Sequence, residues 1–298
     1  MFAFPKSLLG CLVAWSIFPA LNAQAQSPNK GPAKIVIALK PDKDPDRMFE
    51  ERETLAEFVR GATGSDVEVI TPLSNAVIFE GMANGTLDAA FVGAYEFVSA
   101  AKLKAAEVLL ATEIHGKNSY PSYWVCLKDK PYTGIADLKG KSVAFASKTS
   151  ASGYALPLWA LHQKGFLKEG GSPTDFFGNV WYGSGYVSAV ERVLRGDAEA
   201  AACSYYVLDE GRYLKPEQRA KLRKLEEQGP VPTHIIAVRS TLPAAEREVL
   251  AKALLGLNET EFHSLRDNVF GAKLIKVDAK EHVESLVPVI EFLKKIRP

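Results

Sequence analysis

The chain has 298 residues, of which 47% are hydrophobic and 24% charged, and its formal net charge is +1. This composition is typical of a globular protein with one large domain or two ordinary ones. Neither a basic cluster nor an acidic tail stands out, so the charge gives no indication of nucleic acid or a membrane surface as a partner. The five histidines and three cysteines lack the short spacings of metal sites, and the sequence predicts neither a metal nor a cofactor.

Residues 1–25 are predicted to be a secretory signal peptide, which would export the protein from the cytoplasm. One positive side chain, Lys6, precedes an apolar run, and small residues follow, so the mature chain is expected to begin near Gln24 or Gln26. A Leu-Leu-Gly-Cys box ending at Cys11 makes a lipid anchor the alternative. Only three residues separate Lys6 from the Gly-Cys pair, too few for an apolar core, so a soluble mature protein is favoured.

Strand and helix signals alternate along the first third of the mature chain. Lys34 to Lys40 is a β-branched run, and residues 47–64 have an amphipathic helical pattern that ends in glycine. There follow a strand (66–72), a helix (75–85), a buried strand (87–93) and a helix (95–104). This order predicts a mostly parallel sheet with helices on both faces, where ligands bind beyond the carboxyl ends of the strands.

The alternation repeats in the middle of the chain. The signals are an extended run (120–128), a short helix and a strand (134–147), a loop and a helix that follow, and a helix-strand-helix pattern (181–210). Residues 229–240 come next. A long helix is predicted from Ala244 to Leu265, and a last helix near 285–296. The sequence therefore predicts an α/β protein with two lobes, each built on a mixed, mostly parallel sheet.

The strand that ends near residue 146 is joined to the next helix by Thr149-Ser150-Ala151-Ser152-Gly153. Free backbone N–H groups at a helix N-terminus, together with hydroxyl groups, suit a bound anion. The alternative is a simple helix cap in a tight turn, which would stabilise the helix by about 1 kcal/mol. We call residues 149–153 the serine loop.

Five segments in a fixed order carry a resemblance to a known family. They are residues 55–70, 81–100, 134–157, 189–211 and 229–243, and the most specific piece is Asp-Leu-Lys-Gly-Lys (137–141) followed by Ser-x-Ser-Gly-Tyr (150–154). With them the chain resembles the periplasmic solute-binding proteins of phosphate, phosphite and phosphonate uptake systems.

The resemblance implies a two-lobed receptor whose chain crosses a hinge twice and encloses its ligand between the lobes. Lobe one would comprise residues 34–118 and 234–298, and lobe two residues 119–233. The crossings would be Tyr-Pro-Ser-Tyr (120–123) and Pro-Val-Pro-Thr-His-Ile-Ile (230–236). The implied partners are a small oxyanion and an inner-membrane ABC permease, and we expect a monomer.

In that family the serine loop holds three oxygens of a phosphonate-like head group. Ser150 and Ser152 match the family's hydroxyl positions, whereas Ala151 stands where many members have Thr. Tyr186 and Ser204 replace residues that are often acidic, which argues against an amine-bearing ligand. Two further aromatic residues are candidates because Tyr hydroxyl groups donate to oxyanions. The predicted ligand-binding residues are Tyr95, Tyr120, Thr149, Ser150, Ala151, Ser152, Gly153, Tyr186, Cys203 and Ser204.

The expected function is capture of phosphite, phosphate or a simple phosphonate and its delivery to an ABC transporter. The alternative is a sensor of arsenite or arsenate that signals to a membrane histidine kinase, for which Cys126 or Cys203 would supply a thiolate. Whether these two cysteines are free or bonded to each other stays open. An enzyme is not expected: Tyr182 stands where a Gly-x-Ser-x-Gly elbow needs its first glycine, and no Walker or Rossmann motif follows a strand.

Overall fold

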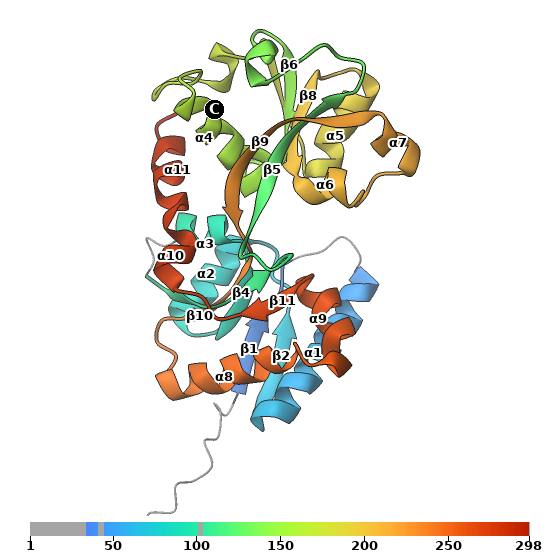
Figure 1. Ribbon diagram of the computed structural model, residues 1–298. Helices are drawn as coiled ribbons and strands as arrows, with labels where there is room; N and C mark the ends of the chain where they lie inside the picture. The colour runs from blue at the N-terminus through green and yellow to red at the C-terminus, as the bar shows by residue number, and fades with distance from the viewer. Residues whose placement is uncertain (1–33, 41–44, 101–103, 298) are drawn as a thin grey trace, which may run out of the picture.

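The computed structural model describes residues 34–40, 45–100 and 104–297. The predicted signal peptide and Cys11 lie outside the described residues. The described chain forms two α/β lobes, one around each of two sheets, connected by long strands (Figure 1). No helix within these ranges combines the length and the hydropathy needed to cross a membrane.

Lobe one is built on a six-stranded sheet in the order β11-β4-β10-β3-β1-β2. Its strands are β1 (Lys34–Ala38), β2 (Asp66–Ile70), β3 (Ala89–Val92), β4 (Ala106–Glu113), β10 (Ile235–Arg239) and β11 (Lys273–Ile275). Its helices are α1 (Pro45–Thr63), α2 (Asn75–Asn84), α3 (Ala94–Ala100), α8 (Ala244–Gly256), α9 (His263–Phe270) and α10 (Ala279–Glu284). Local signals set these boundaries: Ser74 caps α2, and Gly85 ends it at φ 79°, which glycine adopts without strain.

Lobe two is built on a five-stranded sheet in the order β7-β6-β8-β5-β9. Its strands are β5 (Ser119–Leu127), β6 (Ser142–Phe145), β7 (Asn179–Tyr182), β8 (Ala200–Ser204) and β9 (Leu222–Pro232). Helices α4 (Leu156–Gln163), α5 (Tyr186–Arg195), α6 (Tyr205–Asp209) and α7 (Pro216–Ala220) belong to it, with a π-helical turn, η3 (Ala151–Ala155), directly before α4. The described residues also form three short 3-10 helices, η2 (Ile135–Leu138), η4 (Pro173–Asp175) and η5 (Thr260–Phe262).

Both sheets are mixed, and less parallel than the alternating pattern predicts. In lobe one β1 pairs in parallel with β2 and β3, whereas β10 and β11 run antiparallel to their neighbours. In lobe two β6 pairs in parallel with β7 and β8, whereas β5 runs antiparallel to β8 and β9. The strands next to the lobe crossings therefore account for the difference, because a chain that returns from the other lobe enters the sheet from its opposite end.

The two strand connections between the lobes lie side by side. Residues 114–118 lead from β4 to β5, and Thr233 and His234 lead from β9 to β10. The Thr233 amide donates to Asn118 O at 3.0 Å, and the Thr112 amide donates to His234 O at 2.9 Å. The Thr233 hydroxyl donates to Thr112 O at 2.6 Å. These bonds tie the two connections into one short hinge.

The C-terminal region departs from the expected elements. The helix predicted over residues 244–265 is divided into α8, η5 and α9, because the chain turns near Asn258, whose side chain bonds the backbone of Leu274 in both directions. The last helix, α11 (Leu286–Leu293), lies alongside both lobes in Figure 1 and contacts α3 and α4. Its Phe292 packs into the core of lobe two, although lobe one was expected to hold residues 234–298. The buried apolar residues of α11 explain why this helix lies against both lobes.

Candidate functional site

The serine loop follows β6 and leads into the π-helical turn that begins α4. Ser150 is the N-cap, and its Oγ accepts a hydrogen bond of 3.0 Å from the Gly153 amide. The Ala155 amide donates to Ser150 O, also at 3.0 Å. Such π-helical turns occur often at functional sites. The first amide groups of a helix have no acceptor within it, so this turn presents N–H groups at the position predicted for an anion.

Close packing explains why Gly153 follows the two serines. A Cβ atom at this position would lie 2.4 Å from the Ala146 Cβ and 3.0 Å from Ser150 Oγ. The Gly153 carbonyl accepts a hydrogen bond of 2.9 Å from the Ala146 amide. The missing side chain therefore lets the helix start lie against the end of β6, which holds both serine hydroxyls in place.

The phenol of Tyr186, from the first turn of α5, joins the two serine hydroxyls. Its oxygen lies 2.7 Å from Ser152 Oγ and accepts from Ser150 Oγ at 3.2 Å. The Tyr120 phenol belongs to the same group: burial raises its pKa, and the nearby Ser152 side chain opposes this shift. Burial also raises the pKa of Tyr186. Both phenols are therefore protonated at neutral pH and able to donate. We call Tyr120, Ser150, Ser152 and Tyr186 the hydroxyl cluster.

A row of buried hydrogen bonds from strands β9 and β5 holds the backbone of the serine loop, and the sequence analysis did not identify it. The Gln228 side-chain amide in β9 donates to Ser122 Oγ at 2.7 Å, and Ser122 Oγ donates to Ser152 O at 2.5 Å. All three residues are buried. The available signal was a serine and a glutamine within otherwise apolar strand faces, because buried polar side chains need partners.

The two cysteines are free and buried, and they belong to different hydrophobic cores. Cys203 has no exposed surface, and burial raises the pKa of its thiol far above its ordinary value. Burial likewise raises the pKa of Cys126. Thiols held protonated in this way do not favour the thiolate ligand that an arsenite sensor needs. Ser204, next to Cys203, is also fully buried. Its Oγ has no hydrogen-bond partner among the described residues, so this hydroxyl is available to a ligand.

The remaining predicted site residues lie at different depths. Thr149 is exposed, and its hydroxyl bonds Ser147 Oγ at 2.9 Å, so it does not join the hydroxyl cluster. Ala151 is half-buried and packs against the apolar cluster that contains Tyr120. Tyr95 is half-buried in α3 and packs against the same apolar cluster, which also includes Ala155 and Leu156 at the start of α4.

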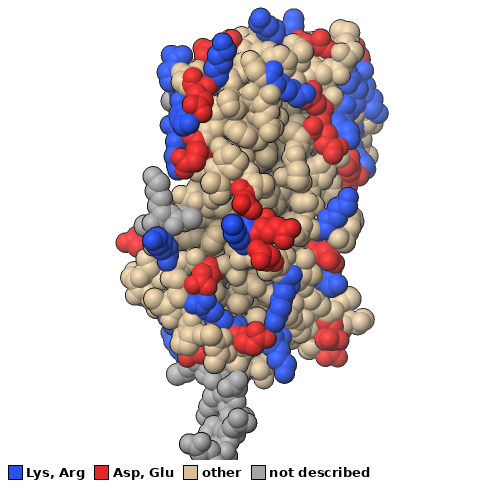
Figure 2. Space-filling view, turned by 60° about the vertical axis from the view of Figure 1, so that its left-hand side comes forward, with Lys and Arg blue, Asp and Glu red and all other residues tan. Residues whose placement is uncertain are grey.

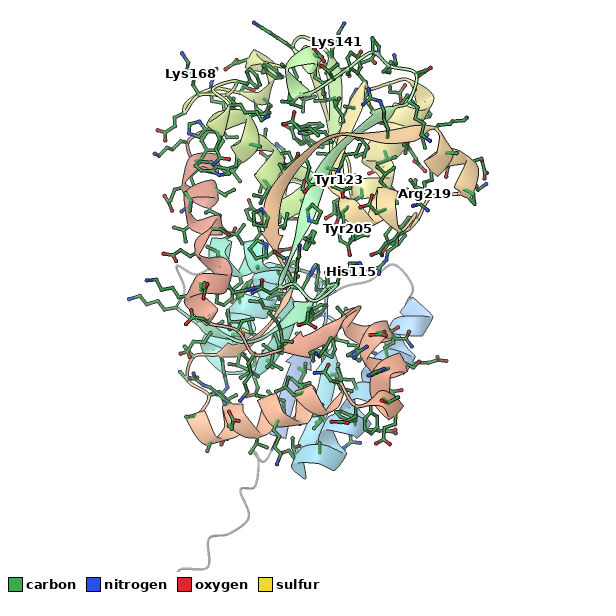
Figure 3. All side chains as sticks on the ribbon, viewed as in Figure 1. His115, Tyr123, Lys141, Lys168, Tyr205 and Arg219 are labelled. Atoms are coloured by element: carbon green, nitrogen blue, oxygen red, sulfur yellow. The ribbon has the colours of Figure 1, made fainter. Side chains whose placement is uncertain are left out.

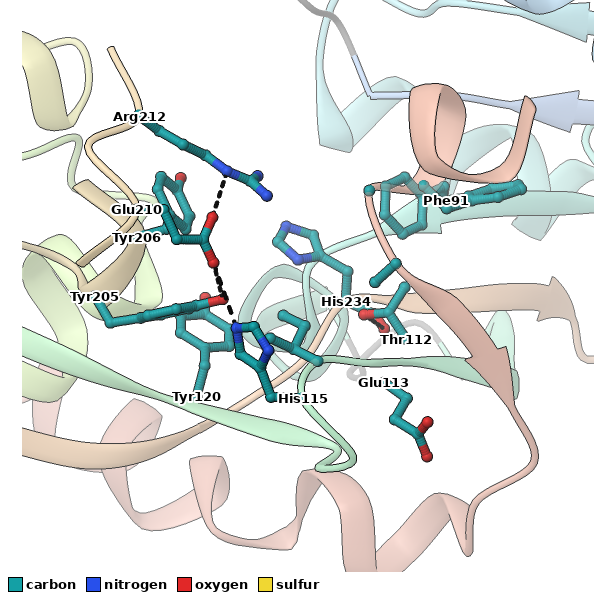
Figure 4. A pocket seen from close by; sticks show the side chains of 14 residues that line it. Phe91, Thr112, Glu113, His115, Tyr120, Tyr205, Tyr206, Glu210, Arg212 and His234 are labelled. Carbon is teal, nitrogen blue, oxygen red and sulfur yellow. Dashed lines mark hydrogen bonds and ion pairs between the residues drawn. The ribbon is translucent and has the colours of Figure 1, made fainter. Parts of the chain in front are cut away.

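A cavity of about 290 Å³ lies between the lobes next to the hydroxyl cluster (Figure 4). Lobe one contributes Phe91, Phe270, His115 and His234 to its lining, among others. The lining residues from lobe two include Tyr120, Tyr205, Tyr206, Glu210 and Arg212. Figure 3 places His115 and Tyr205 at the junction of the lobes. Tyr120 belongs both to this lining and to the hydroxyl cluster, so the cavity and the serine loop are parts of one interlobe site.

The charged groups in the cavity pair with one another. The Glu210 carboxylate lies 2.6 Å from Arg212 Nε and 3.5 Å from His115 Nε2, and it accepts a hydrogen bond of 2.9 Å from Tyr205 (Figure 4). His234 Nε2 lies 2.8 Å from Lys40 Nζ, which can only donate, so the ring is neutral. Burial, followed by the Lys40 charge, holds the pKa of His234 well below its ordinary value.

Neither metal clusters nor a strong surface field accompany this site. Within the ranges that the structure describes, no group of three or more His, Cys, Asp or Glu residues is arranged to hold a metal ion. On the face drawn in Figure 2, Lys and Arg alternate with Asp and Glu over short distances. The face drawn in Figure 2 therefore carries no broad field of one sign.

Comparisons with known proteins show the family of the chain. A model of the periplasmic phosphonate substrate-binding protein of ABC transporters matches residues 37–280. The phosphate-import protein PhnD of Mycolicibacterium smegmatis is 28% identical over 176 residues, which is 57% of this chain and 54% of that protein. The match thus spans about half the length of that relative.

Solved structures match over most of the chain. XAC2383 from Xanthomonas citri, bound to a chloride ion, is similar at a TM-score of 0.74 and 19% identity, covering 88% of this chain and 99% of that chain. PhnD1 from Prochlorococcus marinus in complex with methylphosphonate has a TM-score of 0.71 and 18% identity, covering 89% and 100%. These likenesses establish the two-lobed binding-protein fold. The chain belongs to the family of periplasmic phosphonate substrate-binding proteins of ABC transporters, a family of binding proteins and not of enzymes.

Proposed function

We propose that this protein captures a small tetrahedral oxyanion, namely phosphite, phosphate or a simple phosphonate, at the serine loop and presents it to its permease. The observation that carries the proposal is the hydroxyl cluster at the helix start, where the Tyr186 phenol oxygen lies 2.7 Å from Ser152 Oγ and 3.2 Å from Ser150 Oγ. Tyr120 adds a fourth hydroxyl from the crossing strand β5. The secreted, monomeric form of the receptor is part of the proposal.

Neutral donors suit this ligand class. Hydroxyl and amide N–H groups hydrogen bond strongly to charged oxygens, and the helix N-terminus adds about half a positive unit charge. An oxyanion would then be bound without burying a cationic side chain beside it, which would be costly when the site is empty. The unpartnered Ser204 hydroxyl at the end of β8 offers one further donor near Cys203 and the tyrosines.

Titration calorimetry of the mature protein with phosphate, phosphite and methylphosphonate tests the proposal. We expect one-to-one binding of at least one of them. Arsenite and 2-aminoethylphosphonate serve as comparisons, since the first is a neutral molecule without tetrahedral charged oxygens and the second carries an amine for which the serine loop offers no acid. A ligand at 100 times its dissociation constant should stabilise the fold by about 2.7 kcal/mol. A cooperatively folded protein that binds none of the first three compounds would contradict the proposal.

A further inference from the structure

We propose that the interlobe cavity receives a planar aromatic substituent of the bound oxyanion, so that the ligand is an aryl phosphonate or a similar compound. The inference rests on the proposed function and narrows it: the head group lies at the hydroxyl cluster, and the organic group lies between the rings of the cavity. Size, ring surface, charge balance and position each support this assignment.

The cavity is too large for a tetrahedral oxyanion alone. Its volume is about 290 Å³. A dry cavity of about 150 Å³ lined by apolar side chains is sufficient to bind benzene. The hydroxyl cluster already provides for the head group, so the cavity volume is available for a second part of the same ligand.

Rings from both lobes form the lining. Phe91 and Phe270 of lobe one have ring centroids 5.1 Å apart and meet edge to face. In lobe two the ring of Tyr205 lies 5.9 Å from that of Tyr120 and 5.8 Å from that of Tyr206. These separations are typical of interacting aromatic pairs, and a further ring inserted among them gains the same edge and face contacts.

Charge balance argues against a second charged group on the ligand. Glu210 is compensated by Arg212 at 2.6 Å, and Glu113 by Lys273 at 3.5 Å. The Arg212 guanidinium also lies over the Tyr206 ring, 5.2 Å from its centroid. Lys40, whose ammonium group bonds the neutral His234, is not part of the lining. A carboxylate or an ammonium group in the cavity would have to break one of these pairs, whereas an uncharged ring would not.

The position of the cavity connects it to the head-group site. Tyr120 lines the cavity, and the Ser152 side chain influences the pKa of its phenol. Tyr206 lines it as well, and its ring meets the Tyr186 ring edge to face at 5.7 Å. A substituent on an oxyanion held at Ser150 and Ser152 would therefore reach the cavity past Tyr120 and Tyr206.

Titration of the wild-type protein with methylphosphonate, phenylphosphonate and cyclohexylphosphonate tests the inference. The cyclohexyl compound has similar bulk but no planar ring. We expect phenylphosphonate to bind about tenfold tighter than both others, which corresponds to about 1.4 kcal/mol. Binding of methylphosphonate or phosphate without a preference for the phenyl compound would overturn the inference and leave the proposed function intact. Failure of every phosphorus compound to bind would overturn both.

Two variants localise the effect. Tyr206→Leu removes a ring from the lining, and the preference for phenylphosphonate over methylphosphonate should fall to about twofold or less. The control is Tyr132→Leu, which removes a ring of lobe two outside the cavity and should keep the wild-type preference. Thermal unfolding of each variant checks that it is folded. If Tyr206→Leu does not fold, Phe91→Leu takes its place; a preference that survives the loss of a lining ring in a folded variant would overturn the inference.

Discussion

The Tyr186 phenol oxygen lies 2.7 Å from Ser152 Oγ, although 34 residues separate the two in the chain. The same oxygen accepts from Ser150 Oγ at 3.2 Å. In the free protein a tyrosine therefore already occupies the serine hydroxyl groups. An arriving oxyanion must take these hydroxyl groups from the phenol, and the phenol in turn becomes a donor to the oxyanion. The first two predictions test this relationship from each side.

Replacing Ser152 with Ala should weaken oxyanion binding by about 1 to 3 kcal/mol, the cost of losing one charge-assisted hydrogen bond in a buried site. The helix cap should persist, because Ser150 and not Ser152 accepts from the Gly153 amide. Thr149→Ala is the matched control, since that hydroxyl is exposed and bonds Ser147. Calorimetric titration with phosphate or methylphosphonate measures the affinity of both variants. Equal affinities would show that Ser152 does not bind the oxyanion.

Replacing Tyr186 with Phe should lower the affinity about five- to tenfold, because one donor to the anion disappears while the ring still packs against Tyr206. Unfolding stability should change by about 1 kcal/mol or less, since the two serine hydroxyls remain close to other donors and acceptors. Titration calorimetry with phosphate or methylphosphonate measures whether the affinity falls or rises. A gain in affinity would mean that the phenol competes with the ligand and does not assist it.

The serine loop could be identified from its own short segment, whereas Tyr186 was predicted only through the family resemblance, and the difference has a physical reason. Caps and helix starts are encoded locally, so Ser150, Ser152 and Gly153 could be identified within one short segment. Tyr186 could be placed only by the family comparison, because its contact depends on how α5 packs against β6. Ser122 and Gln228 were missed for the same reason: each is a single polar residue whose partner lies elsewhere in the chain.

The sheets also show that local sequence patterns do not reveal contacts between distant segments. β1 and β3 could be predicted because each is a continuous apolar run between turn signals. β9 was largely missed, since Leu222–Pro232 alternates buried residues with charged ones that face solvent and contains glycine and proline. Its strand conformation follows from pairing along β5 and not from local preference. The cavity depends on this crossing geometry, because its lining residues come from separate segments of both lobes.

The buried histidines should make the fold sensitive to acid. Burial lowers the pKa of His234 far below 6.5 and also lowers that of His282. The unfolded chain takes up these protons near pH 6.5, and the folded one does so only at lower pH, so protonation favours unfolding. The contribution of these neutral histidines to the free energy of unfolding is complete above pH 6.5, and it is lost as the pH falls below 6.5. Each histidine that stays neutral should cost about 2 kcal/mol of unfolding free energy between pH 7 and pH 5.

Urea unfolding at several pH values measures this dependence. His234→Gln replaces the ring with an amide that can still accept from Lys40 and cannot titrate. The variant is expected to lose less unfolding free energy between pH 7 and pH 5 than the wild type, whatever its stability at pH 7. Identical pH slopes for the two proteins would show that His234 does not stay neutral in the fold.

Replacing Gly153 with Ala should disturb folding and binding together. The added Cβ would lie 2.4 Å from the Ala146 Cβ, so the helix start must move away from β6, and overpacking of this kind costs about 1 to 3 kcal/mol. The same movement displaces Ser150 and Ser152, and affinity for the oxyanion should fall with the melting temperature. Gly61→Ala is the control: its Cβ would meet nothing within 4 Å in α1, and the change should stabilise the helix by about 0.5 to 1 kcal/mol. If Gly153→Ala keeps both the wild-type affinity and its stability, close approach to β6 is not what positions the serine loop.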